Sequence, residues 1–196
     1  FLSPLVGIIL YLMHQKNNGR FRHVGFSCHG NLPVLKRFLE AYGSHMEFCQ
    51  LQINYIDWTF QNGKEKVDLL NEYHIPVCVM EPLRGGRLAR LSEQEAAPLK
   101  AMRPEETIPA WAFRFLQSIP SVTMILSGMS DMEQMKANIA TFAEEKPLSA
   151  GEMEGLLEMA QGMVSKSVLP CTACHYCVSH CPQGLDIPSL LALYNE

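Results

Sequence analysis

The chain has 196 residues, of which 47% are hydrophobic and 18% are charged, and its formal net charge is −4. This composition excludes a disordered chain, because enough apolar surface exists to offset the entropy lost on folding. The slightly acidic balance argues against nucleic acid as a partner and against a polybasic membrane-binding patch. We therefore expect one globular domain of ordinary size with a small appendage.

The most apolar stretch lies at the start of the chain, from Phe1 to Met13. It is too short to span a bilayer, which takes about 20 residues, and it lacks the basic start and small-residue cleavage site of a signal peptide. We interpret it as a buried segment whose packing partners precede it in a longer protein. Since the first residue is Phe rather than Met, we expect a processed, trimmed or fragmentary chain.

Four short apolar runs are each followed by a segment in which apolar residues recur at helical spacing. The runs predict strands over 23–28, 48–53, 76–80 and 122–127, and the segments predict helices over 32–42, 64–73, 108–117 and 131–143. Further helices are expected over 149–165 and, shorter, over 189–194. Continuous apolar runs are typical of strands buried on both faces, so the alternation predicts an α/β fold with a parallel sheet and right-handed crossovers.

Polar and glycine residues follow each predicted strand, at 27–30, 52–55, 81–83 and 127–130. Ligands of parallel sheets bind at the carboxyl ends of the strands, so these four segments are expected to line one rim. A cofactor site at that rim fits this composition. Strand-to-helix turns in general share the composition, so the pattern alone does not identify the ligand.

The strongest motif lies near the C-terminus, where Cys171, Cys174, Cys177 and Cys181 follow the spacing C-x2-C-x2-C-x3-C and Pro182 comes next. Four cysteines this close are poor disulfide partners, and the same run holds 4Fe–4S clusters in bacterial ferredoxins. We interpret the run as an iron–sulfur metal site in a reducing compartment, and we therefore expect a cytoplasmic protein. The alternative is a structural zinc site, which more often uses cysteine pairs separated by a longer spacer.

The fourth ligand of the cluster is open to two interpretations. In two-cluster ferredoxins the last cysteine of such a run serves the other cluster, so a remote cysteine could close this one. We favour Cys181, because Cys28, Cys49 and Cys78 stand singly in apolar stretches and are interpreted as small core residues. The two histidines within the run are interpreted as neighbours of the site rather than ligands.

Several motifs in this order together resemble the C-terminal half of aldo/keto reductases that carry a ferredoxin-type extension. The motifs are HVGFS at 23–27, QINY at 52–55, MEPLRGGRL at 80–88, LSGMS at 126–130 and the segment from Cys171 to Pro188. The resemblance implies a partial (β/α)8 TIM barrel, with the four units as strands five to eight. It also implies that the full-length protein reduces a small-molecule carbonyl substrate with NAD(P)H.

The resemblance divides the chain into four parts. These are a remnant of a preceding helix or strand at 1–20, the C-terminal half of the barrel at 21–148, a linking helix at 149–168, and the ferredoxin-like 4Fe–4S segment at 169–196. The family's catalytic Asp, Tyr, Lys and His act from the first four strands, whose motifs are missing here. We therefore assign no catalytic residue and expect this chain alone to be inactive.

Cofactor contacts are also implied by the resemblance. Ser27 and Gln52 match residues that hold the nicotinamide carboxamide, and Tyr55 matches the ring that stacks beside the nicotinamide. The loop over the pyrophosphate corresponds to 82–88, with contacts from Pro82, Leu83, Gly85 and Gly86. The segment around the adenosine end comprises Ser127, Gly128, Met129 and Ser130, together with Gln134 and Asn138.

Three positions depart from the family pattern. Cys28 stands where better-known members have Asn, Gly128 where a Lys that binds the 2′-phosphate is common, and Gln134 where an Arg is common. Two cations are therefore missing, which leaves the choice between NADH and NADPH open unless Arg84 or Arg87 supplies the charge.

Two functions remain open at this stage. In the first, the full-length protein is an oxidoreductase whose cluster is either structural or exchanges electrons with a redox partner. A hydride carries two electrons and a cluster passes one at a time, so direct coupling would need a flavin or such a partner. In the second, the chain is a non-catalytic iron–sulfur module for electron transfer or partner docking. Neither function involves nucleic acid or a membrane.

Overall fold

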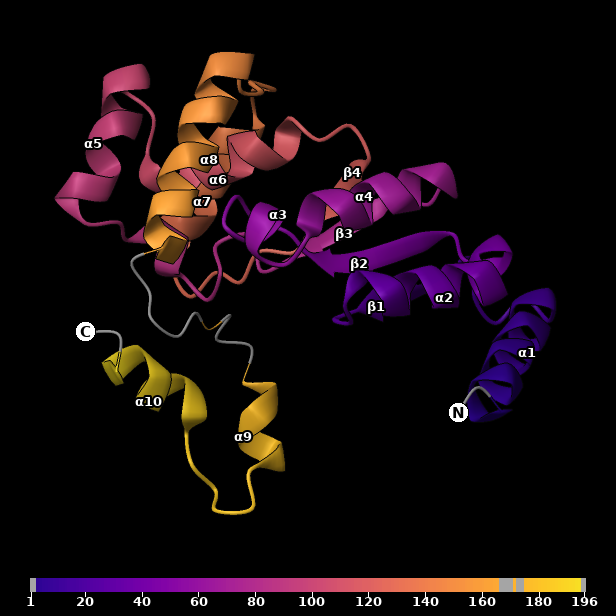
Figure 1. The fold of residues 1–196 in the computed structure, drawn as a ribbon. Coiled ribbons are helices and arrows are strands. Elements are labelled where there is room, and N and C mark those ends of the chain that lie inside the picture. Colours follow the sequence, from indigo (N-terminus) through magenta and orange to yellow (C-terminus); the bar gives the residue numbers. More distant parts are fainter. Residues whose placement is uncertain (1–2, 166–170, 172–174, 195–196) are drawn as a thin grey trace.

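A computed structural model describes residues 3–165, 171 and 175–194. Four parallel strands form one sheet in the order in which they occur along the chain (Figure 1). They are β1 (Gly25–Cys28), β2 (Phe48–Gln52), β3 (Val77–Met80) and β4 (Val122–Ile125). Parallel neighbours need crossover connections, which here are helical. The four predicted strands and the parallel α/β sheet are confirmed.

The four helices expected between and after the strands are also present. They are α2 (Leu32–Tyr42), α4 (Gly63–Glu72), α6 (Ile108–Gln117) and α7 (Met132–Phe142). The side chains of Asn31 and Thr107 accept hydrogen bonds from backbone N–H groups at the starts of α2 and α6, and each helix has a proline in its first turn. Local capping signals therefore account for where these helices begin.

Helices α8 (Ala150–Ser165) and α10 (Ile187–Tyr194) confirm the two remaining predicted helices. Helix α1 (Ser3–Asn17) lies within residues 1–20, which were expected to be a helix or a strand. The structure adds elements that were not expected: η1 (Gly43–His45), α3 (Asp57–Phe60), η2 (Arg87–Ala89), α5 (Glu93–Met102) and α9 (Tyr176–His180). A reciprocal capping box of Ser92 and Glu95 begins α5. That motif is readable in the sequence and could have predicted this helix.

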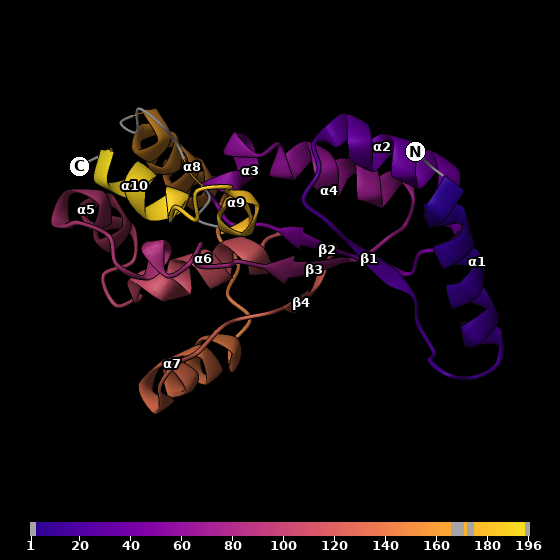
Figure 2. The same cartoon turned by 90° about the horizontal axis from the view of Figure 1, so that it is seen from below.

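The main core lies between the sheet and the helices on one of its faces. Leu51 and Val79 are neighbours across β2 and β3, and both are buried, as are Leu35 and Leu39 of α2. Figure 2 shows α2 and α4 together on one side of the strands. Their burial removes a continuous apolar surface from water, which is the main stabilising contribution in such a fold.

The other face of the sheet is only partly covered. Gln50 and Cys78 are neighbours on this face and are half-buried, and Met124 beside Cys78 on β4 is 59% exposed. The expectation that the strands are buried on both faces is therefore wrong for the described residues. Hydrophobic runs are compatible with either arrangement, because composition does not show which element lies opposite a strand.

The apolar N-terminal run forms α1, and most of its described surface is exposed. Ile8, Leu10 and Tyr11 are 55%, 64% and 62% exposed, whereas Ile9 is buried. Within this chain only one side of the helix contacts the core, so the interpretation of this run as a segment buried by preceding parts of a longer protein stays a prediction. None of the described helices combines the length and the apolarity that crossing a bilayer requires.

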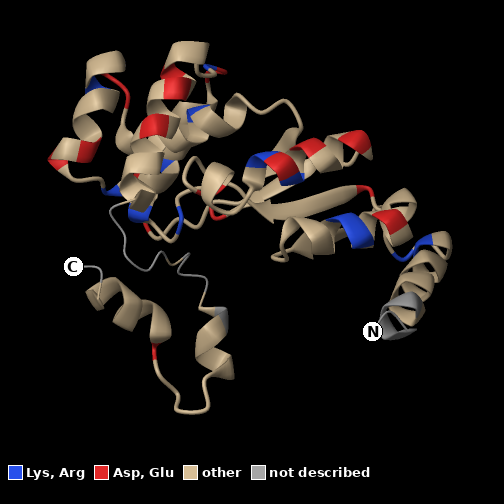
Figure 3. Ribbon diagram, in the orientation of Figure 1, with Lys and Arg blue, Asp and Glu red and all other residues tan. Residues whose placement is uncertain are grey.

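Helices α9 and α10 pack against each other and form what we call the C-terminal hairpin, residues 175–194. None of its described residues belongs to the core, whereas Leu156, Ala160 and Met163 of α8 do. Figure 1 shows the hairpin apart from the sheet. Asp186 is its only Asp, Glu, Lys or Arg (Figure 3). The hairpin is therefore packed and charged differently from the rest of the protein.

Candidate functional site

The sheet topology brings the four predicted rim segments to one edge. Because all four strands are parallel, the segments that follow them emerge on the same side of the sheet. Ser27 near the end of β1 is exposed, whereas Gln52 at the end of β2 is 9% exposed. The rim therefore combines surface groups with a polar layer beneath them.

That polar layer is a buried network around the carboxylate of Asp57. Oδ2 of Asp57 accepts hydrogen bonds from Nε2 of Gln52 at 2.8 Å, from Nδ2 of Asn54 at 2.8 Å and from Nε of Arg84 at 3.3 Å. Asp57 and Asn54 are fully buried, and Arg84 is 4% exposed. Neither Asn54 nor Asp57 is among the cofactor residues predicted from the sequence, because nothing local shows that an acid after an apolar strand will meet a distant arginine.

The network has consequences for two predicted cofactor residues. The Gln52 amide, expected to hold the carboxamide, donates a hydrogen bond from Nε2 to Asp57. The Arg84 guanidinium, considered as a source of positive charge for phosphate, pairs with Asp57 and lies over the ring of Phe60 at 5.6 Å. The guanidinium of Arg84 is therefore paired inside the protein, whereas Arg87, at the start of η2, is exposed.

The β3–η2 loop, residues 81–86, follows β3 and holds four residues in the left-handed region: Glu81 (φ 57°), Arg84 (φ 49°), Gly85 (φ 65°) and Gly86 (φ 90°). Glycine adopts this region freely, but each of the two non-glycine residues costs about 1–2 kcal/mol. Pro82 is buried, Leu83 is half-buried, and both glycines are exposed. Because these two glycines have no side chains, a ligand can approach the backbone of the loop closely.

Tyr55 lies in the core rather than at the surface of the rim. Its ring is fully buried and packs edge-to-face on Phe115, with 6.3 Å between the ring centroids. Burial raises the pKa of the phenol well above its usual range. The role of Tyr55 beside the nicotinamide stays a prediction.

The end of β4 contributes a hydrogen-bonded pair and one end of a groove. Nδ2 of Asn138 donates to Oγ of Ser127 at 3.3 Å. Both residues, with Met129, line one end of a cavity of about 750 Å³ between β4 and α7. The rest of the groove is mainly apolar and runs along β4. The structure therefore brings three of the predicted adenosine-site residues together.

The turn before α7 is organised by Gln134. Its Oε1 accepts a hydrogen bond from the Ser130 N–H at 2.8 Å, and its Nε2 donates to Asp131 at 2.9 Å. Asp131 in turn caps the start of α7 by accepting from the Gln134 N–H. Gly128 is exposed, and a Cβ at its position would meet nothing within 4 Å. This turn is thus shaped by internal contacts, with open space at Gly128.

The predicted metal ligands are only partly within the described residues, because Cys174 lies outside them. Cys171, Cys177 and Cys181 are half-buried. Across the residues that the structure describes, no three or more His, Cys, Asp or Glu side chains are grouped to hold a metal ion. Hydrogen bonds from the backbone of residues 183–185 lower the pKa of the Cys181 thiol, which favours its thiolate form.

The remaining cysteines differ in burial. Cys49 is fully buried, which confirms its interpretation as a core residue, and burial raises the pKa of its thiol. Cys28 and Cys78 are half-buried. The histidines beside the run have neighbours within the hairpin: His175 lies 3.9 Å from Asp186, and Nδ1 of His180 lies 3.1 Å from Oγ of Ser179.

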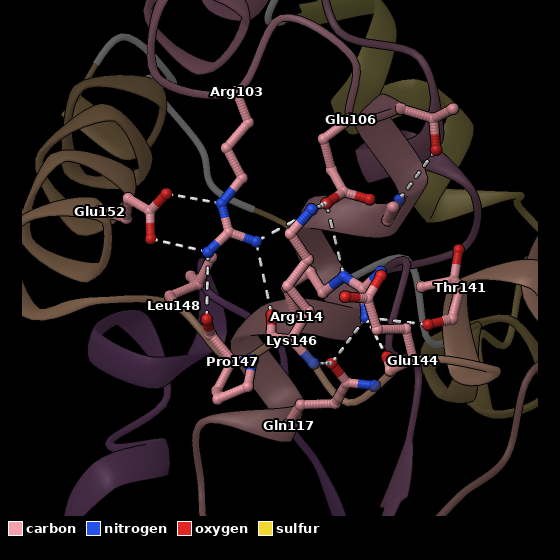
Figure 4. A network of polar contacts seen from close by, with 12 residues as sticks. Arg103, Glu106, Arg114, Gln117, Thr141, Glu144, Lys146, Pro147, Leu148 and Glu152 are labelled. Carbon is pink, nitrogen blue, oxygen red and sulfur yellow. Dashed lines mark hydrogen bonds and ion pairs between the residues drawn. The ribbon is translucent and has the colours of Figure 1, made fainter.

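A second polar network holds α8 against the body of the protein (Figure 4). Nε and Nη2 of Arg103 donate to Oε1 and Oε2 of Glu152 in α8, at 2.5 and 2.7 Å. Glu106 lies between Arg103 at 3.6 Å and Arg114 at 3.5 Å. Arg103 holds the pKa of the Glu152 carboxyl down at about 2. Because these charges are paired with one another, we regard the network as structural.

Comparison with known proteins supports these observations. The aldo/keto reductase family model matches residues 4–160, a span that ends before the cysteine run. Comparison with curated protein sequences finds no match. Solved structures provide similar folds.

An aldo-keto reductase from Bacillus halodurans in its holo form is 22% identical, with a TM-score of 0.66, and the match covers 80% of this chain and 56% of that one. Aldose reductase from Giardia lamblia is 14% identical, with a TM-score of 0.61 and coverage of 81% and 51%. An aldo/keto reductase from Brucella melitensis is 15% identical, with a TM-score of 0.57 and coverage of 76% and 52%.

The chain thus spans about half the length of these structures, and at such identities the similarity shows the fold alone. The family model, in contrast, covers most of the chain and includes all four strands, the β3–η2 loop and the turn before α7. By this match, the chain belongs to the aldo/keto reductase family.

Proposed function

We propose that this chain is part of an oxidoreductase that reduces small carbonyl compounds with a nicotinamide cofactor, and that it supplies the dinucleotide-binding rim. The observation that carries the proposal is the family match over 4–160, which includes every strand of the sheet. Parallel sheets bind their ligands at the carboxyl ends of their strands, where the polar residues of this chain gather. When bound, the nicotinamide supplies a hydride to the carbonyl carbon.

The surface residues of the rim fit a dinucleotide. Ser27 is exposed at the end of β1, Gly85 and Gly86 expose left-handed backbone, and Ser127 with Asn138 lines the groove beside α7. We propose that these groups bind the cofactor directly. Gln52 and Tyr55 then act from below the surface, since one is held by Asp57 and the other packs in the core.

Catalysis needs more than this rim. The resemblance places the family's catalytic groups on barrel strands that precede these four, and the chain covers about half the length of the similar structures. We propose that the active enzyme contains the other half of the barrel. The described residues bind and orient the cofactor in this scheme, and none of them is assigned to proton transfer.

A direct binding measurement tests the proposal. The 196-residue chain is titrated into NADH and, separately, NADPH, while the reduced nicotinamide fluorescence is recorded. The double substitution Ser127→Ala with Asn138→Ala should weaken binding about tenfold or more, since removing hydrogen-bond partners of a ligand costs about 1–3 kcal/mol. Ser44→Ala, at the exposed turn that precedes β2, is the matched control. Equal affinity for both variants would exclude the proposed site.

We also propose that the cysteine run binds a 4Fe–4S cluster through Cys171, Cys174, Cys177 and Cys181. The ferredoxin spacing supports this, as do the backbone N–H groups that stabilise the Cys181 thiolate. Protein prepared without oxygen should contain iron and acid-labile sulfide in equal amounts, about four of each per chain. Zinc without sulfide would instead establish a structural zinc site.

A second function is favoured by the hairpin's surface. Leu190, Leu193 and Tyr194 of α10 are 50%, 67% and 65% exposed, and the hairpin holds a single formal charge, on Asp186. A non-catalytic module that docks a redox partner would use such a surface. Nicotinamide-dependent turnover by the full-length, cluster-loaded enzyme separates the two functions, because a docking module alone would give none.

A further inference from the structure

The β3–η2 loop carries a contact that the proposed cofactor binding does not explain. The backbone N–H of Gly85 donates to Oε2 of Glu81 at 2.5 Å, so a carboxylate of the loop itself bonds to the exposed glycine backbone. Glu81 is exposed, and both residues have left-handed backbone. The Gly85 N–H, which could otherwise bind an anion, therefore already holds a carboxylate.

The position of Glu81 is enforced from below by the buried network. The carbonyl oxygen of Glu81 accepts hydrogen bonds from Nδ2 of Asn54 at 3.0 Å and from the N–H of Arg84 at 3.1 Å. Asn54 and Arg84 are both held by Asp57. A strained non-glycine conformation persists only where its surroundings impose it, and such strain is common in ligand-binding loops. Here the left-handed backbone of Glu81 lets its side chain fold back to the Gly85 N–H.

Among the residues that the structure describes, Glu81 forms no ion pair with Lys, Arg or His. Arg84 is buried against Asp57, which leaves Arg87 as the exposed cation of the loop motif. The N–H groups of Gly86 and Arg87 are bonded to backbone carbonyl oxygens at 3.0 and 3.2 Å. A phosphate that approaches the loop therefore meets a negative charge already bonded to the Gly85 N–H.

We propose that Glu81 competes with the cofactor for this loop: its carboxylate occupies the Gly85 N–H until the pyrophosphate of the dinucleotide displaces it. Glu81 thereby sets the affinity for phosphate groups at the rim. The inference rests on the proposed function, because it names what controls cofactor binding there. It requires only a change of side-chain rotamer and no covalent step.

The test uses the 196-residue chain and its Glu81→Gln variant, which keeps the side-chain shape but removes the charge. Inorganic pyrophosphate binding is measured by calorimetry, NADH binding by fluorescence, and the Gly85 amide signal by NMR. Removal of one like charge at a partly screened surface site should tighten both ligands about tenfold. Glu72→Gln, at the exposed end of α4, is the matched control and should change neither.

Each outcome decides the inference. Tighter binding by Glu81→Gln, with a shifted Gly85 amide signal in the absence of ligand, supports it. Unchanged or weaker binding by a variant that still binds NADH overturns the inference and leaves the proposed function standing. A Gly85 signal that does not respond to the substitution also overturns it, because the contact is then missing in solution. If no form of the chain binds either ligand, both proposals at this rim fail.

Discussion

The sheet with the helices packed on it, which we call the body, and the C-terminal hairpin differ in how their apolar and charged side chains are buried and paired. In the body, Trp111 and Phe115 are fully buried, and charged groups such as Arg84 and Asp57 are paired. In the hairpin, Pro188 is the buried residue of α10, while Leu193 is 67% exposed. The body therefore has its own hydrophobic and electrostatic support. The hairpin lacks this support within the described residues, which is the usual situation of small segments organised by a metal.

The difference between the body and the hairpin bears on how the rim depends on the cysteine run. A rim built on the body can keep its shape whether or not the cysteines bind metal. A cysteine segment without a core gains its order from its ligands. Substitutions should accordingly have large effects on stability in the body and small ones in the hairpin, and four predictions test this difference.

The largest effect is expected from Arg84→Met. It removes the cation beside Asp57 and leaves a fully buried carboxylate without its partner, which costs about 3–5 kcal/mol. Denaturant unfolding followed by circular dichroism measures the loss in the free energy of unfolding. Arg87, at the start of η2, is exposed, so Arg87→Met should change stability by less than about 0.5 kcal/mol. Equal stability of the two variants would contradict the importance of the buried pair.

Leu39→Ala should have the next largest effect. Leu39 of α2 is 1% exposed, so truncation removes buried apolar surface and leaves a cavity, at a cost of about 2–5 kcal/mol. The same unfolding measurement applies. Val34→Ala on the same helix is a suitable control, because Val34 is 52% exposed. A loss below about 1 kcal/mol for Leu39→Ala would mean that α2 packs less closely than the structure shows.

Acid should weaken the attachment of α8 to the body. Arg103 lowers the pKa of Glu152 to about 2 from its usual 4.5, so the unfolded chain binds a proton more readily than the folded one. The stabilisation is complete above about pH 4.5 and is lost as the pH falls towards about 2. In Glu152→Gln this part of the acid dependence should disappear.

The free energy of unfolding of the original chain and of Glu152→Gln is measured between pH 2 and pH 6 at constant ionic strength. Glu154→Gln changes an exposed acid on the same helix and should retain the dependence of the original chain. Glu47, whose pKa is also lowered to about 2 by Lys16, contributes its own acid dependence in all three proteins. A Glu152→Gln profile that parallels the original would show that the pair contributes nothing to stability.

The smallest effect is expected in the hairpin. Leu193→Ala removes a side chain that is 67% exposed and should change the unfolding of the body by less than about 0.5 kcal/mol. Addition of a chelator, which would remove the proposed cluster, should likewise leave the unfolding transition of the body unchanged. A large loss in either experiment would show that the hairpin and the body are energetically coupled.

Much of the fold could be predicted from local patterns. The strand runs and the helical spacing of Trp111, Phe115 and Leu116 each act over a few neighbouring residues, and the structure confirms these strands and this helix. The cap that Asn31 forms at the start of α2 is equally local. The capping box of Ser92 and Glu95 is equally local and could have predicted α5. Cysteine spacing is also a local property, which is why a cluster can be proposed from the sequence alone.

Only the tertiary structure decided which groups are buried and what they contact. It placed Tyr55 on Phe115, paired Asp57 with Arg84 across 27 positions of sequence, and left much of α1 and one face of the sheet exposed. Burial and long-range pairing depend on the element that lies opposite a residue, and hydrophobic periodicity carries no information about that element. Local propensity therefore determined the elements of this protein, whereas long-range packing determined the chemistry of its rim.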